Sequence, residues 1–147
     1  MTALLAVVLC LAGPGPVGGV EALRPPATQM DSLLAAAQRA ARAWRGHDFA
    51  ALVGEGAPVV VSLPGVAATA PLRSAQAAEL LRAFAEGTRE IEVEVTLARA
   101  VDRDRAYVEV QRAFTPRGSR VPTHQTVYLG LRREGAGFRV SEVRVVP

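Results

Sequence analysis

Two segments in the C-terminal half alternate polar with apolar residues, and their polar members could do acid–base chemistry. They are Tyr107, Glu109 and Gln111 in one segment, and His124, Thr126 and Tyr128 in the next. A strand has a side-chain period of two, so each trio lies on one face of its strand. If both faces point inward, Glu109 or His124 could act as a general base. Tyr107 or Tyr128 would then donate a hydrogen bond to the developing oxyanion.

The opposite orientation of the same strands makes a different prediction. The alternating apolar residues would then form the inner face, and they are Val108, Val110, Val127, Leu129 and Leu131. The polar trios would form the outer face of a sheet, where paired tyrosine rings are suited to burial between two copies of a protein. The sequence favours this orientation, which predicts a homodimer through the outer sheet face.

Other reaction chemistries find little support. His47 and His124 are the only histidines, and neither has a second histidine at helical spacing, so we expect no metal site and no cofactor. No serine lies in a Gly-x-Ser-x-Gly turn, which is the usual setting of a hydrolase nucleophile. Trp44 and Phe49 are candidates to line a pocket for a small apolar ligand, with simple core packing as the alternative.

The N-terminus is typical of an export signal. The apolar run 4–12 is too short to span a bilayer as a helix, and Val20 and Ala22 are the small residues that signal peptidase requires. We therefore expect a signal peptide over residues 1–22 and a mature chain that begins at Leu23, although no Lys or Arg precedes the apolar run. The alternative is an N-terminus that is merely apolar. No transmembrane segment is predicted.

The number of cysteines indicates the cellular compartment of the protein, and the distribution of its charges indicates which partners it can bind. Removal of the leader would remove Cys10, the only cysteine, and with it any disulfide or thiolate chemistry. An exported protein without disulfides is typical of a bacterial cell envelope, so we predict a periplasmic or extracellular location. The net charge of +3 comes from 17 arginines that are spread among acidic residues. Because they do not cluster with aromatic residues, we predict no nucleic-acid binding.

The elements that would position these residues follow from the hydrophobic periodicity. An extended linker is expected over 23–28, followed by a single domain over 29–147. A first helix is predicted, capped by Asp31 and ending at Gly46. Its apolar face has residues at spacings of three and four, namely Met30, Leu33, Leu34, Ala37, Ala41 and Trp44. Asp48 is expected to cap a short second helix up to Val53, and 59–63 to form a short strand.

A third helix and four long strands complete the predicted domain. Ser74 is expected to cap the helix, and Gly87 to end it in a left-handed conformation. The period then changes from 3.6 to 2. The first strand, which follows Gly87, is expected to be buried on one face only. Its buried residues would be Ile91, Val93, Val95 and Leu97, and its exposed residues Glu92, Glu94 and Thr96. Strands over 106–114, 123–133 and 138–146 follow. The predicted fold is α+β, with N-terminal helices packed on a curved antiparallel sheet.

This element order resembles the nuclear transport factor 2-like superfamily, which has a cone-shaped, cystatin-like fold. Within the superfamily, the stretches 63–65 and 72–84 are similar to a bacterial exported subgroup of unknown function. That subgroup has a Leu-Pro-Gly strand end, a Ser-Lys-Ala-Gln-Ala helix start and a Leu-x-x-Phe-Phe ending. This chain has Arg73-Ser74 without a lysine, and Ala85 where an aromatic residue is usual. The resemblance covers residues 29–147, and its motifs are structural, so it transfers no catalytic residue.

The superfamily contains enzymes, binders and interaction modules, so the resemblance leaves the function open. We expect an exported module that binds a small ligand or another protein. The alternative is a small cofactor-free acid–base enzyme of the isomerase or dehydratase type, because related enzymes such as ketosteroid isomerase place Asp, His and Tyr on the inner sheet face. An inward carboxylate facing a closed cavity would favour the enzyme, and a filled cone would favour the module.

Overall fold

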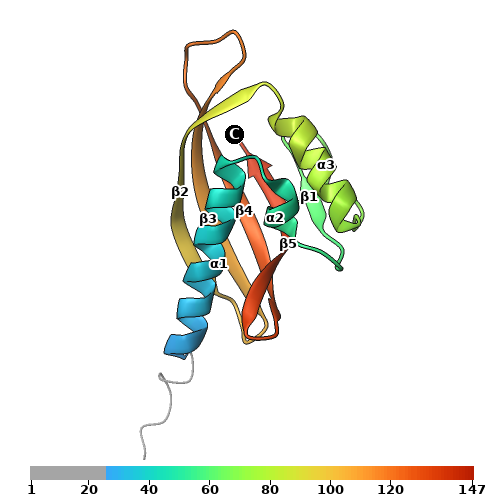
Figure 1. Cartoon of the computed structure of the whole chain (residues 1–147), viewed down its shortest axis with the longest axis vertical. Helices are drawn as coiled ribbons and strands as arrows, with labels where there is room; N and C mark the ends of the chain where they lie inside the picture. Colours follow the sequence, from blue (N-terminus) through green and yellow to red (C-terminus); the bar gives the residue numbers. More distant parts are fainter. Residues whose placement is uncertain (1–25) are drawn as a thin grey trace, which may run out of the picture.

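The computed structural model describes residues 26–147. The predicted signal peptide, the cleavage after Ala22 and positions 23–25 of the predicted linker lie outside these residues. The described chain folds as an α+β unit in which helices pack against one curved five-stranded sheet (Figure 1). This confirms the predicted fold class. No helix within residues 26–147 is long and apolar enough to cross a membrane.

The sheet is formed mainly by four long strands that follow one another along the chain. They are β2 (Thr88–Ala100), β3 (Arg105–Pro116), β4 (Thr123–Glu134) and β5 (Gly137–Val146). Each pairs antiparallel with the next, as predicted. The short strand β1 (Val60–Ser62) pairs parallel with β5, so the sheet is mixed, with the order β1-β5-β4-β3-β2.

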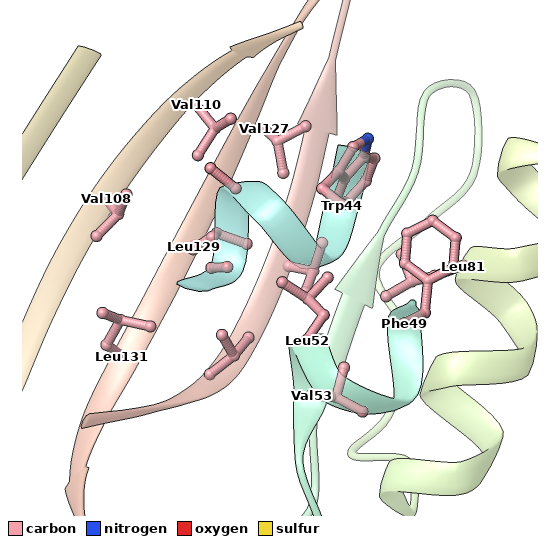
Figure 2. Close-up of a cluster of buried hydrophobic side chains, with 14 of the residues drawn as sticks. Trp44, Phe49, Leu52, Val53, Leu81, Val108, Val110, Val127, Leu129 and Leu131 are labelled. Carbon is pink, nitrogen blue, oxygen red and sulfur yellow. The ribbon is translucent and has the colours of Figure 1, made fainter. Parts of the chain in front are cut away.

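Three helices cover one face of this sheet, and the hydrophobic core lies between the two layers. They are α1 (Ala27–Arg45), α2 (Phe49–Val53) and α3 (Ser74–Ala85). Figure 1 shows α1 lying lengthwise over the sheet, with α2 and α3 beside β1 and β5. Inward valines and leucines of β3 and β4 meet Trp44 of α1, while Phe49 of α2 and Leu81 of α3 fill the space toward β1 (Figure 2).

Two predicted helix caps are wrong by a few residues. The N-cap of α1 is Pro26 and not Asp31, so Ala27 and Thr28 of the predicted linker form its first turn. Pro26 has the extended conformation that favours a helix start, and its carbonyl accepts from Gln29 and Met30. At α3 the N-cap is Arg73 and Ser74 is the first helical residue, while the side chain of Gln76 accepts from the Arg73 backbone N–H.

The other predicted helix ends are confirmed. The Asp48 carboxylate accepts a hydrogen bond from the Ala51 backbone N–H at 3.0 Å and caps α2. Gly87 has a φ of 78° and turns the chain from α3 directly into β2. The buried stripe of α1 contains Leu33, Ala37, Ala41 and Trp44, but Leu34 lies outside it at 44% exposure because Ala36 and Ala40 face the core instead.

Strand β2 departs most from the prediction. Ile91 and Leu97 were expected to be buried with Val93, but they are 51% and 41% exposed. The pairing of β2 with β3 shifts register between Glu90 and Glu92 and again between Val95 and Leu97. Each irregularity is a β-bulge, which adds one residue and moves the following side chains to the other face. The first bulge therefore places Ile91 outward and leaves Glu90 on the inner face.

Candidate functional site

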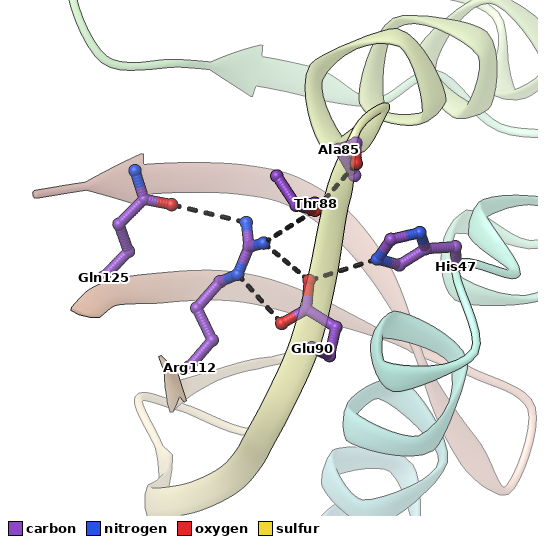
Figure 3. A network of polar contacts seen from close by, with 6 residues as sticks. All are labelled: His47, Ala85, Thr88, Glu90, Arg112 and Gln125. Carbon is purple, nitrogen blue, oxygen red and sulfur yellow. Dashed lines mark hydrogen bonds and ion pairs between the residues drawn. The ribbon is translucent and has the colours of Figure 1, made fainter. Parts of the chain in front are cut away.

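A buried ion pair lies on the inner face of the sheet, beside the C-terminal end of α1. Glu90 of β2 and Arg112 of β3 have side chains that are 3% and 1% exposed. Arg112 donates from Nη2 to Glu90 Oε1 at 2.5 Å and from Nε to Oε2 at 3.2 Å (Figure 3). This two-point contact matches the planar guanidinium to the carboxylate, so it fixes the orientation of both groups.

Polar groups from neighbouring strands complete the surroundings of the guanidinium. Arg112 Nη2 also donates to the Thr88 hydroxyl at 3.4 Å, and Nη1 donates to Gln125 Oε1 at 3.3 Å. Thr88 in turn donates to the Ala85 carbonyl at the end of α3. The network therefore connects β2, β3 and β4 to α3 at a single point (Figure 3).

Aromatic rings cover the parts of Arg112 that make no hydrogen bond. The guanidinium carbon lies 4.0 Å from the centroid of Phe114 and 5.3 Å from that of Trp44. Burial lowers the pKa of Arg112 from its ordinary value, and the adjacent Glu90 carboxylate opposes this shift. An isolated charge in this position would be very costly, so the pair forms one unit.

His47 connects this unit to the protein surface. Its Nε2 lies 3.1 Å from Glu90 Oε1, and its side chain is 31% exposed. Because a carboxylate only accepts hydrogen bonds, the contact requires the proton on Nε2. His47 has a φ of 53° at the end of α1, where the backbone N–H groups of His47 and Asp48 bond back to Trp44 and Ala43. Helices usually place glycine there, so the contact with Glu90 and stacking on Phe49 offset some backbone strain.

Sequence reasoning missed the roles of Glu90 and Arg112, and it considered His47 as a metal ligand and rejected that role. Glu90 occupies the start of a strand that reads as exposed, and only a bulge brings it inward. Arg112 did carry a signal, because it continues the inward series of Val108 and Val110 at spacing two. An arginine on an otherwise apolar strand face predicts a buried carboxylate partner. Within residues 26–147, no three His, Cys, Asp or Glu side chains gather as a metal site would require.

The structure brings three of the four predicted catalytic candidates together, but on the outer face of the sheet. Val108, Val127 and Leu129 are buried under the helices, and the alternating residues point the other way. Tyr107 and Tyr128 stack with ring centroids 5.7 Å apart, and the Tyr107 hydroxyl donates to Glu109 at 3.0 Å. These side chains therefore do not line the inside of the cone.

The remaining sequence candidates lie apart from this group. His124 is exposed near the start of β4, where its Cα partner in the sheet is Ala113. Trp44 and Phe49 are 1% and 0% exposed and contact each other edge to face at 5.3 Å. They fill the core beside the ion pair instead of lining an open space. The Trp44 Nε1 atom is buried without a hydrogen-bond partner among residues 26–147.

Comparison with solved structures identifies the fold. A ketosteroid isomerase-like protein from Erwinia carotovora atroseptica matches with a TM-score of 0.64 and 19% identity, over 80% of this chain and 94% of that protein. A putative dehydratase of the NTF2-like family from Streptomyces avermitilis matches with a TM-score of 0.64 and 16% identity, over 83% and 98%. A Nostoc punctiforme domain of unknown function with a cystatin-like fold matches with a TM-score of 0.59 and 18% identity, over 83% and 78%.

The chain therefore has the NTF2-like, cystatin-like fold that its element order resembles. No protein-family model and no curated protein sequence matches it. At identities below 20%, these structural matches establish the fold, and the chemistry has to be argued from the residues of this chain.

The ion pair predicts a non-additive effect of mutation on the free energy of unfolding. Glu90→Leu and Arg112→Met, made singly, should each cost about 3–5 kcal/mol because each leaves a buried charge without its partner. The double variant should cost less than either single variant, as measured by urea unfolding. A double variant that loses the sum of the two single effects would show that the charges do not act as a pair.

The outer tyrosine predicts a loss of stability at high pH. Burial, together with the hydrogen bond and negative charge of Glu109, raises the pKa of Tyr107 from 10.0 to about 12. The folded state thus favours the neutral phenol, and this stabilisation is present below pH 10 and lost as the pH rises toward 12. Unfolding measured across this range should show a steeper fall for the wild type than for Tyr107→Phe. Equal slopes would contradict the assignment.

Proposed function

We propose that the protein is a non-enzymatic interaction module that acts as a homodimer through the outer face of its sheet. The observation that carries this proposal is the contrast between the two faces. The space between the inner face and the helices is filled by the fully buried Arg112 of β3, Trp44 of α1 and Phe49 of α2. The outer face carries an ordered set of aromatic and charged side chains that no helix within residues 26–147 covers.

The strand registers arrange the outer side chains in rows that run across the sheet. One row contains Arg99, Tyr107, Gly130 and Glu142 on β2, β3, β4 and β5. The next contains Leu97, Glu109, Tyr128 and Arg144 in the same strand order. Arg144 lies over the Tyr128 ring at 5.0 Å. Each row thus carries opposite charges and a tyrosine, and the order of the charges is reversed between the two rows.

A two-fold axis parallel to the strands, between β3 and β4, would make this pattern self-complementary. It maps β2 of one copy onto β5 of the other, which sets Arg99 opposite a partner glutamate at position 142. It also sets Tyr107 over a partner glycine at position 130, beside the Glu142 side chain that lies against that glycine. Isologous interfaces require this kind of complementarity between a surface and itself.

We place this module outside the cytoplasm, in the bacterial cell envelope or beyond it. The support is the signal-like leader over residues 1–22 and a mature sequence without cysteine. The intact mass of the exported protein should correspond to a chain that begins at Leu23.

Reversal of one charge on the outer face should weaken the dimer without unfolding the monomer. Glu142→Arg would set two arginines opposite each other at both symmetric positions. Sedimentation velocity should show a dissociation constant higher by roughly 30-fold, because two pairs of about 1 kcal/mol are lost. The double variant Arg99→Glu/Glu142→Arg restores the opposite charges and should restore the dimer. A wild type that stays monomeric at all concentrations, or a double variant no better than the single one, would contradict the interface.

An acid–base enzyme is the second candidate, and the contact between His47 and Glu90 favours it. A partly exposed imidazole held by a buried carboxylate has the geometry of an oriented general base. Solved structures of the same fold are described as ketosteroid isomerase-like and as a putative dehydratase. Against this, Glu90 is already engaged by two nitrogen donors of Arg112, Nε and Nη2.

A turnover assay separates the two candidates. A β,γ-unsaturated ketone is the probe, and formation of the conjugated enone is followed by absorbance. If the protein is an interaction module, the isomerisation rate in its presence should equal the rate in buffer alone. An acceleration that Glu109→Gln retains and His47→Gln abolishes, with unchanged folding, would favour the enzyme and contradict the proposed function.

A further inference from the structure

A groove opens between α1, α2 and the hairpin of β4 and β5, away from the outer sheet face. Its volume is about 290 Å³. The floor is apolar and is formed by side chains that are at most 7% exposed, namely Ala36, Ala40, Leu52, Leu131, Phe138 and Val140. The space exists because α1 presents two alanines, one turn apart, toward the hairpin.

The rim of this groove is charged, and one of its arginines is incompletely hydrogen-bonded. Arg139 has a side chain that is only 16% exposed. Its Nε atom is 2.8 Å from Glu134 Oε2, but the alignment does not make a hydrogen bond. Its Nη1 atom reaches two backbone carbonyls only at 3.5 Å, the outer limit for such contacts. Within residues 26–147, the Glu134 carboxylate is therefore the one close acceptor group of this mostly buried guanidinium, and its Nη atoms have no acceptor nearer than 3.5 Å.

We propose that this groove binds a small amphipathic carboxylate, with the alkyl chain on the apolar floor and the carboxylate at Arg139 and Arg39. Arginine is the side chain best matched to a carboxylate, because its planar donors fit both oxygens. Arg39 is exposed on α1 and lines the same groove. Glu134 is 64% exposed and Glu55 is exposed, so the high dielectric of water weakens the repulsion from these two carboxylates. The proposal does not depend on the homodimer.

The volume sets the size of the ligand. At about 30 Å³ for each water-sized group, the groove has room for roughly ten such groups, which matches an octanoate ion in size. A cationic amphiphile of similar length offers the same alkyl chain but the wrong charge. Octanoate is therefore the probe, and octyltrimethylammonium is its matched control.

The experiment is an NMR titration of the full mature chain with each compound. Octanoate should shift the backbone amides of Gly54, Leu131 and Val140 saturably, and octyltrimethylammonium should not. A second groove of about 310 Å³, between α1 and β2, contains Val93 and Glu94 and serves as an internal reference. Shifts centred on that groove, an absence of saturable shifts, or equal binding of both compounds would overturn the proposal.

Variants at exposed positions test the contacts without disturbing the core. Arg39→Gln should weaken octanoate binding by roughly tenfold, and Arg39→Lys should recover part of the loss. Ala51→Phe should block the groove from its rim and abolish binding. Ala75→Phe makes the same change on exposed α3 and should leave binding intact. Unchanged affinity in Arg39→Gln or Ala51→Phe, with folding confirmed by circular dichroism, would contradict the assigned site.

Discussion

The inner face of this fold depends on one buried interaction, the ion pair between Glu90 and Arg112. Both side chains are almost fully removed from water, so neither charge could be there without the other. The desolvation cost is of the order of several kcal/mol per ion, which the two-point contact and the surrounding hydrogen bonds offset. The pair therefore contributes more to a unique arrangement of β2, β3, α1 and α3 than to net stability.

Several local features follow from this constraint. The bulge after Glu90 directs its carboxylate inward, and it also explains why Ile91 is exposed. Trp44 and Phe114 cover the guanidinium of Arg112, so two of the large aromatic residues lie around the charge. His47 holds a left-handed backbone conformation from which its ring reaches Glu90. The part of the cone beside the C-terminal end of α1 is thereby closed.

The periodicity of the sequence was sufficient to predict the element order, the four paired strands and the α+β class. It failed at the helix starts and in β2, where a single residue decides which residue caps a helix or which side chains are buried. Asp31 and Ser74 are good capping residues, yet both helices begin earlier than predicted. Pro26 starts α1, and the Gln76 side chain bonds the backbone of Arg73 at the start of α3, so local geometry outweighs propensity. Glu90 could not be recognised, because a bulge leaves no clear mark in the pattern of a strand. The outer position of Tyr107 and Glu109 was the orientation that the sequence favoured, because Val108 and Val110 supply the apolar side.

The most direct test of the central claim is the hydrogen exchange of the Arg112 Nε–H group, measured by NMR at neutral pH. A guanidinium enclosed by Glu90, Phe114 and Trp44 should exchange on the timescale of the protected core amides, far more slowly than exposed Arg103. Exchange as rapid as that of Arg103 would mean that water reaches the inner face of the sheet. The cone would then be open, and the account of a closed interior would be wrong.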